Sequence, residues 1–202
     1  MTDAIRITKT TAKKDKPKDK DLAFGNVFTD HMFVADFQEE KGWYDPRVEP
    51  YGPFPLDPAT AVLHYGQSLF EGLKAFRGAD GKIRFFRLDR HCKRMHDGAD
   101  RLCIPPIEPA LMHDAIVALV QADSDWVPSS PGTSLYIRPT IIASEPFLGV
   151  RPAKRYIFFV IASLVISAPY SATNRPCIAS PRLLPRGTGG TQLGIRRRGR
   201  ND

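Results

Sequence analysis

The order of apolar and polar positions predicts a core of mixed α and β structure between residues 21 and 166. In five stretches apolar, aromatic and β-branched residues are continuous or alternate with polar ones, as in buried strands. Two longer stretches repeat apolar residues every three or four positions, which is the pattern of a helix with one buried side. The predicted strands are Met32–Phe37, Leu73–Phe76, Ile83–Leu88, Thr133–Ser144 and Tyr156–Ile166, and the predicted helices are Arg90–Leu102 and Glu108–Ala122.

Turn and cap residues indicate where some of these elements end. Gly78 and Gly81 lie between two of the predicted strands, which predicts a β-hairpin. Asp89 stands where the N-cap of the first helix is expected, because its carboxylate can accept hydrogen bonds from unpaired backbone N–H groups. The segment Tyr44–Pro58 contains five prolines, so we expect an extended surface loop there and no helix.

Both ends of the chain lack this periodicity. Residues 1–20 are polar and rich in lysine, and we expect them to form a flexible leader. A mitochondrial presequence would be rich in arginine and poor in acids, which this segment is not. Residues 167–202 are rich in Ser, Pro, Gly and Arg, and no core face can be drawn through them. The predicted organisation is therefore a leader, a folded domain over residues 21–166 and a tail.

The net charge of +7 is confined to one part of the chain. Arg155–Asp202 contains eight arginines, no lysine and one acid, so it accounts for the whole net charge. A basic tail could bind nucleic acid without regard to sequence. This alternative is less favoured, because no aromatic side chain lies among residues 186–200 to stack on bases.

Composition excludes several other classes of protein. With 42% apolar residues the chain is an ordinary globular protein and not a disordered one. No apolar run approaches the ~18 residues of a membrane span, and the N-terminus lacks the apolar stretch of a secretory signal. The three cysteines show no CxxC spacing and the five histidines no HxxxH or HExxH pair, so we expect no disulfide framework and no metal site. These features favour a cytoplasmic location.

Two pairs of residues could bind anions. Arg94 lies one helical turn after Arg90, although the pattern alone favours a solvated basic face for both. Tyr136 and Arg138 alternate in a predicted strand, so their side chains leave the same face. A phenol and a guanidinium placed in this way can bind a carboxylate. A cross-strand pair on an exposed sheet face is an equally good interpretation.

Long blocks of the chain resemble the branched-chain amino-acid aminotransferases, almost continuously from Phe24 to Ser163. The blocks include FGNVFTDHMF (Phe24–Phe33), GWYDPRVEPYGP (Gly42–Pro53), LHYGQSLFEGLKAFRG (Leu63–Gly78) and SLYIRPTIIASEPFLGVRPA (Ser134–Ala153). D-amino-acid aminotransferase and aminodeoxychorismate lyase share the architecture, but they do not usually share FTDHM followed by HYxxxxFEGLKAFR. The resemblance implies an α+β fold, the small N-terminal domain of the fold-type IV pyridoxal-phosphate aminotransferases, with the large C-terminal domain missing.

The resemblance also implies roles for individual residues. Arg94 matches the arginine that holds the phosphate of pyridoxal 5′-phosphate. Tyr136 and Arg138 match the pair that reaches into the neighbouring subunit's site and helps to recognise the substrate carboxylate. Tyr65 and Phe70, for which the pattern alone predicts core packing, match the wall of the pocket for the substrate side chain, and Phe24 matches it as well.

The implied reaction transfers the amino group of leucine, isoleucine or valine to 2-oxoglutarate, giving a branched-chain 2-oxo acid and glutamate. The implied enzyme is a homodimer that needs pyridoxal 5′-phosphate and uses neither a metal, a nucleic acid nor a membrane.

Such enzymes also need a lysine that forms a Schiff base with the cofactor. By spacing this lysine is expected near Arg196–Arg198, but no lysine follows Lys154, so no catalytic residue is assigned. The resemblance stops at Leu164, and we expect that the tail is translated out of register through a frameshift or a wrong gene model. The alternative function is a catalytically inactive fragment that acts as a dimerisation or interaction module.

Overall fold

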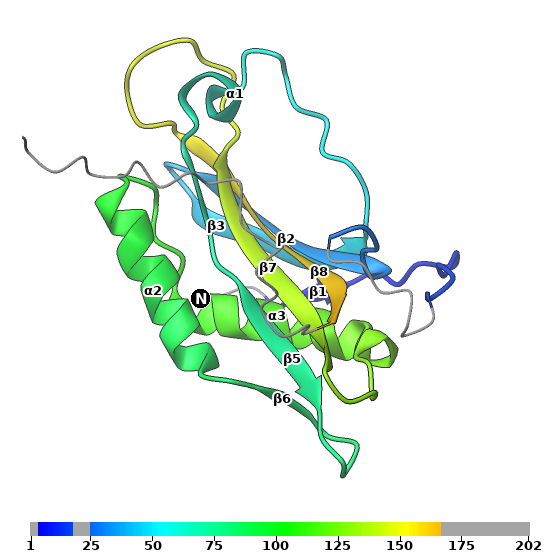
Figure 1. Ribbon diagram of the computed structural model, residues 1–202. Coiled ribbons are helices and arrows are strands. Elements are labelled where there is room, and N and C mark those ends of the chain that lie inside the picture. Colours follow the sequence, from blue (N-terminus) through cyan, green and yellow to red (C-terminus); the bar gives the residue numbers. More distant parts are fainter. Residues whose placement is uncertain (1–3, 18–24, 167–202) are drawn as a thin grey trace, which may run out of the picture. The chain divides into compact units, whose positions relative to one another are not determined.

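The described part of the chain is built on one sheet of eight strands, against which two long helices pack (Figure 1). The computed structural model describes residues 4–17 and 25–166, which lie in the first of two units of the chain, residues 1–168. Phe24 and the predicted tail, residues 167–202, lie outside the described residues.

The strands follow the order β1-β3-β2-β8-β7-β5-β6, and β4 pairs with β7. The pairs are antiparallel except for β1 with β3. The strands are β1 Arg6–Ile7, β2 His31–Gln38, β3 Gly42–Pro50, β4 Ser68–Phe70, β5 Leu73–Arg77, β6 Ile83–Phe85, β7 Thr133–Ala143 and β8 Arg155–Ile166. The helices are α1 Ala61–Tyr65, α2 Leu88–Arg101 and α3 Pro109–Ala122, followed by the 3₁₀ helix Ser124–Trp126.

The central strand β7 has a buried face and an open face. Every second residue from Leu135 to Ala143 is buried, and all of these except Pro139 belong to one apolar core together with residues of α2 and α3. The residues between them are only half-buried, and they include Tyr136 and Arg138. The alternation predicted from the sequence is therefore confirmed, and it separates a core side of the sheet from a side that a ligand can reach.

Both predicted helices are confirmed, and the start of the first differs from the prediction. Helix α2 buries Cys92, Met95 and Ala99 on its apolar side, but it begins at Leu88 after an N-cap at Arg87. The predicted N-cap, Asp89, is wrong: Asp89 lies in the first turn, where its charge still interacts favourably with the helix dipole. The early start also ends the predicted strand Ile83–Leu88 at Phe85.

The predicted loop Tyr44–Pro58 is wrong in its first part, because β3 runs through Gly42–Pro50. The register between β2 and β3 shifts between Val34 and Asp36, which marks a bulge in the facing part of β3. Pro46 lies in this bulge, where a residue without an N–H group leaves the ladder of hydrogen bonds intact. Proline content therefore excluded a helix correctly, but it did not exclude a bulged strand.

Residues 4–17 differ from the predicted flexible leader. Strand β1 pairs with β3, and the chain after it is held by two backbone hydrogen bonds to buried side chains. The N–H of Thr10 donates to Nε2 of His31 at 2.8 Å, and the N–H of Lys14 donates to Oδ1 of Asp30 at 2.9 Å. The buried acceptors fix a segment whose composition is that of a solvated chain, which composition alone could not indicate.

Candidate functional site

A buried carboxylate holds the guanidinium of Arg94. Nε and Nη2 of Arg94 donate to the two oxygens of Glu71, with 2.7 Å between Nη2 and Oε2. The Glu71 side chain is 5% exposed, whereas that of Arg94 is 68% exposed. Glu71 lies in the short connection between β4 and β5, and this connection brings it against α2. No described residue accepts a hydrogen bond from Nη1 of Arg94, so this edge of the guanidinium is available to a ligand.

Further donors surround the Glu71 carboxylate. Nδ1 of His91 lies 3.0 Å from Oε2, and the N–H of Gly72 donates to the same oxygen at 3.2 Å. A carboxylate can only accept, so Nδ1 of His91 carries the proton. Burial alone would raise the pKa of Glu71, but the hydrogen bonds from Arg94, His91 and Gly72 and the Arg94 charge outweigh it and lower the pKa. Glu71 is thus an ionised, fully bonded partner for Arg94.

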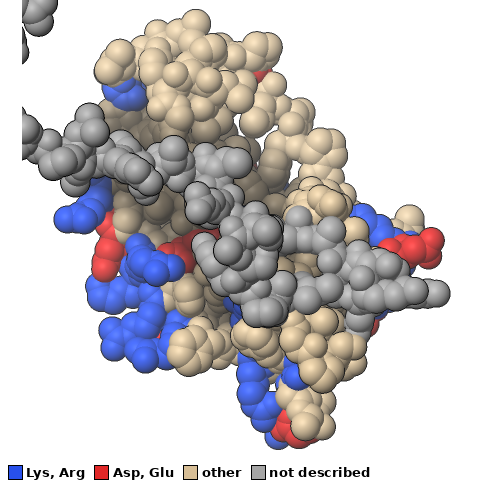
Figure 2. Space-filling model, viewed as in Figure 1, with Lys and Arg blue, Asp and Glu red and all other residues tan. Residues whose placement is uncertain are grey.

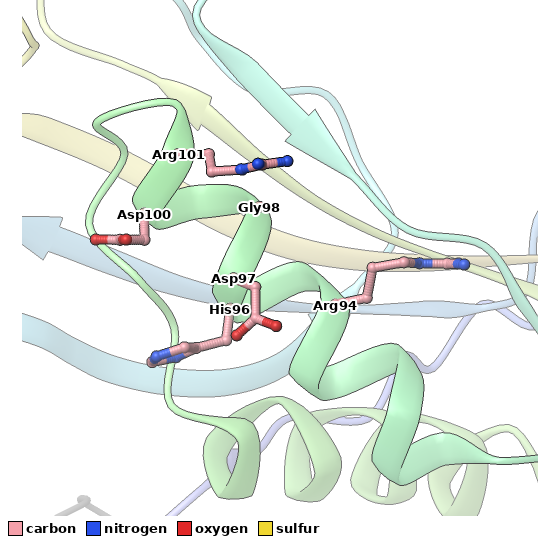
Figure 3. A pocket seen from close by; sticks show the side chains of 6 residues that line it. All are labelled: Arg94, His96, Asp97, Gly98, Asp100 and Arg101. Atoms are coloured by element: carbon pink, nitrogen blue, oxygen red, sulfur yellow. The ribbon is translucent and has the colours of Figure 1, made fainter.

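Arg94 also lines an open groove of about 580 Å³ along α2, and it points in the same direction as Arg101 (Figure 3). The other lining residues are His96, Asp97, Gly98 and Asp100. Over the part of the surface where α2 lies, acidic side chains stand among the Lys and Arg side chains (Figure 2). Two arginines and two aspartates leave the groove with little net charge. A phosphate would therefore be bound here by a directed arginine and not by a general excess of positive charge.

Tyr136 and Arg138 form a second cluster on the open face of β7. Nε and Nη2 of Arg138 donate to the Tyr136 hydroxyl at 3.0 Å and 2.7 Å. The Arg138 guanidinium also lies 4.2 Å from the centre of the Phe70 ring. The Tyr136 hydroxyl packs against Gly72, where a Cβ atom would overlap it. The shared face of the pair is as predicted, and the bonds between the two residues, together with contacts to Phe70 and Gly72, fix both side chains.

Tyr136 lines two cavities. The smaller one, about 200 Å³, is lined by Arg138 and by residues that include Phe28 and Ser163. The larger one is a groove of about 770 Å³ that extends from Tyr136 to His91 and is lined mostly by apolar side chains. Both cavities are large enough for groups the size of a carboxylate or a short aliphatic side chain.

Three consecutive residues join the two clusters. Phe70 contacts Arg138, Glu71 binds Arg94, and Gly72 packs against Tyr136. Glu71, Gly72 and His91 were not among the site residues predicted from the sequence. The available signal was the tripeptide Phe-Glu-Gly within LHYGQSLFEGLKAFRG, which places a carboxylate between an aromatic residue and a glycine in an otherwise apolar run.

Tyr65 is not brought together with the other predicted site residues. It lies at the end of α1 with 48% of its surface exposed. It lines a different groove, of about 410 Å³, together with Cys103 and Arg151. Phe24, which was assigned to the same pocket wall, is outside the described residues, so of the three predicted aromatic residues only Phe70 lies in the cluster around Arg138.

Two further findings concern residues 4–17 and 25–166 only. In these two ranges no three His, Cys, Asp or Glu side chains are grouped so that they could hold a metal ion. No helix within the described residues is both long and apolar enough to cross a membrane.

Curated proteins similar in sequence share one activity in their names. The chain is 50% identical over 161 residues to branched-chain-amino-acid aminotransferase 2 of Bacillus subtilis, which covers 80% of the chain and 44% of that protein. It is 44% identical over 189 residues to the cytosolic branched-chain-amino-acid aminotransferase of Mus musculus, covering 92% and 48%. The chain thus spans less than half the length of these relatives. No protein-family model matches the chain.

Solved structures agree on the fold. The branched-chain aminotransferase of Thermoproteus uzoniensis, solved with norvaline, matches with a TM-score of 0.52 and 22% identity over 65% of this chain and 40% of that one. The enzyme of Escherichia coli matches with a TM-score of 0.51 and 22% identity over 70% and 41%. This likeness confirms the predicted α+β fold of the small N-terminal domain of the fold-type IV aminotransferases. The described part of the chain therefore belongs, as a partial member, to the branched-chain amino-acid aminotransferase family.

Proposed function

We propose that this chain forms part of an enzyme that transfers the amino group of leucine, isoleucine or valine to 2-oxoglutarate. The observation that carries the proposal is the junction of residues 70–72. This junction joins an arginine with a free edge, Arg94, to a fixed tyrosine–arginine pair, Tyr136 and Arg138. The enzymes named in the sequence comparison act on branched-chain amino acids, and the chain matches them over 80% or more of its own length.

Arg94 would hold the phosphate of pyridoxal 5′-phosphate. Its fixed guanidinium and free Nη1 edge suit a phosphate oxygen, because a charge-assisted hydrogen bond from a preorganised donor is strong. When it is bound, this cofactor supplies the electron sink that amino transfer requires. Asp97 and Asp100 line the same groove and would repel a phosphate, so the guanidinium of Arg94 would have to offset this repulsion.

Arg138 and Tyr136 would orient the substrate by its carboxylate. The contacts with Phe70 and with the Tyr136 hydroxyl restrict the Arg138 guanidinium before a substrate binds, so little rotamer freedom is lost on binding. The Phe70 ring would exclude water beside the aliphatic side chain, where each buried methylene contributes about 0.8 kcal/mol. The second substrate, 2-oxoglutarate, would use the same guanidinium for a carboxylate.

The working enzyme would be a homodimer in the cytoplasm. The proposal is supported by the open face of β7, on which Tyr136 and Arg138 are only half-buried and could contact a partner. The mouse relative is named as cytosolic. Sedimentation of the purified protein tests the dimer, and a monomer at micromolar concentration would contradict it.

A chimaeric enzyme tests the proposed reaction. Residues 1–166 of this chain are joined to the remaining part of the Bacillus subtilis relative, and amino transfer to 2-oxoglutarate is measured. We expect transfer from leucine, isoleucine and valine, and a loss of about a hundredfold in kcat/KM for Arg138→Gln, which cannot pair with the carboxylate. A chimaera that folds and binds the cofactor but transfers no branched-chain amino group would contradict the proposal.

The alternative function, a non-catalytic interaction module, is less well supported. The relatives are named as aminotransferases, and Arg94 and Arg138 are held in arrangements that suit small anions. Co-purification with an intact aminotransferase subunit, together with an inactive chimaera, would favour this alternative.

A further inference from the structure

We infer that Glu71 is a positioning residue, which clamps one edge of the Arg94 guanidinium so that the other edge faces the cofactor phosphate. His91 assists by donating to the same carboxylate. This inference rests on the proposed function, and it adds a role for two side chains that do not themselves touch the ligand.

The geometry of the guanidinium makes the clamp directional. Its five N–H groups lie in one plane at fixed angles. Nε and Nη2 of Arg94 donate to Glu71, so the plane and the orientation of the group are set. The two N–H groups of Nη1 then project from the opposite edge, for which no described residue is a partner. With 68% of its side chain exposed, Arg94 can present this edge to a ligand.

Glu71 is suited to this task because it is itself fixed. Its side chain is 5% exposed, and it accepts hydrogen bonds from the backbone of Gly72 and from His91. An exposed arginine on a helix otherwise occupies many rotamers, and a ligand would have to select one of them. A tie to a buried carboxylate removes that freedom before the ligand arrives.

The Glu71 carboxylate also has an electrostatic disadvantage. For this reason the direction in which phosphate binding changes when Glu71 is removed distinguishes positioning from charge alone. A carboxylate next to an anion site repels the anion, so removing Glu71 should strengthen phosphate binding if charge alone matters. If Glu71 positions Arg94, its removal should weaken binding in spite of the lost repulsion. Asp97 is the matched control, because it lines the same groove but pairs with Lys93 at 2.7 Å and not with Arg94.

The test titrates the full chain with inorganic phosphate and follows the ¹⁵N NMR signals of the arginine side chains. We expect Glu71→Gln to weaken phosphate binding at Arg94 by about tenfold, and Asp97→Asn to leave it unchanged or strengthen it. Glu71→Asp keeps the charge but shortens the reach by one methylene, so it should also weaken binding. If Glu71→Gln binds phosphate as well as the wild type or better, the inference is overturned.

A second measurement needs no variant, and it covers the case in which Glu71→Gln does not fold. In the wild type the Nε–H of Arg94 should exchange with water more slowly than that of Arg90, whose exposed partner Asp89 lies 3.5 Å away. Equal exchange rates would overturn the clamp. If phosphate leaves the Arg94 signals of the wild type unchanged, the phosphate role under the proposed function is wrong and the inference falls with it. Unchanged binding in Glu71→Gln overturns the inference alone.

Discussion

Two buried carboxyl groups, Asp123 and Glu71, have opposite surroundings. Asp123 binds Nδ1 of His31 at 2.6 Å, and the two side chains are only 2% and 4% exposed. Glu71 binds Arg94, which is 68% exposed. When the partner is buried, both bonded groups lie within the fold, whereas an exposed partner places one of the bonded groups at the surface. The first arrangement serves stability, and the second prepares a group for a ligand.

The largest expected effect is at the buried pair of Asp123 and His31. His31→Leu removes the side-chain partner of the buried Asp123 carboxylate and the acceptor for the half-buried Thr10 N–H. Oδ1 of Asp123 then has lost its bond, although Oδ2 still accepts from the backbone N–H of residue 31. We expect the free energy of unfolding to fall by about 3 kcal/mol, measured by urea denaturation. His113→Leu is the control, because its pair with Asp114 is 52% and 66% exposed and should change stability by less than about 0.5 kcal/mol. Equal losses of unfolding free energy in the two variants would show that the buried pair stabilises the fold no more than the exposed pair does.

Gly72→Ala should have the next largest effect, since the new Cβ atom would overlap the Tyr136 hydroxyl. Either the connection between β4 and β5 or the Tyr136 side chain must move, which we expect to cost about 2 kcal/mol of unfolding free energy and to separate Tyr136 from Arg138. At Gly52 the nearest atom to an added Cβ is 3.9 Å away, so Gly52→Ala serves as the control. Denaturation curves that coincide for the two alanine variants would contradict the close approach.

The Glu71 pair should give a smaller effect that depends on pH. Burial raises the pKa of Glu71, but hydrogen bonds from Arg94 and His91 outweigh it, so the folded pKa lies below the ordinary value of 4.5. The stabilisation is therefore present above 4.5 and is lost as the pH falls through the folded value. Between about pH 6 and pH 3, Glu71→Gln should lose less stability than the wild type. Parallel curves of unfolding free energy against pH would contradict this, and Glu40→Gln, at an exposed position, should follow the wild type.

The smallest effect is expected where both partners are exposed. Lys93 and Asp97 pair at 2.7 Å on α2, with side chains that are 62% and 53% exposed. Lys93→Gln should lower the free energy of unfolding by about 0.3 kcal/mol, which differential scanning calorimetry can bound. A loss above about 1 kcal/mol would show that the exposure of an ion pair does not determine how much it stabilises the fold.

The sequence predicted the strands and helices that carry the site better than it predicted the contacts within the site. Alternation in β7 predicted the shared face of Tyr136 and Arg138, because it depends only on local geometry. The bond between Glu71 and Arg94 joins residues 23 positions apart, and no local pattern encodes it. The tie between Thr10 and His31 escaped prediction for the same reason, since a polar segment can be held by backbone bonds that composition does not reveal.

The most direct test of the proposed phosphate site compares Arg94 with Arg90, another exposed arginine of α2. The full chain is treated with phenylglyoxal, with and without pyridoxamine phosphate, and the modification of each arginine is measured by mass spectrometry. Arg90 is the internal standard, because its side chain is 66% exposed and that of Arg94 is 68% exposed. We expect pyridoxamine phosphate to protect Arg94 and not Arg90, and pyridoxamine without phosphate to protect neither. Equal protection of both arginines, or none at Arg94, would contradict this expectation.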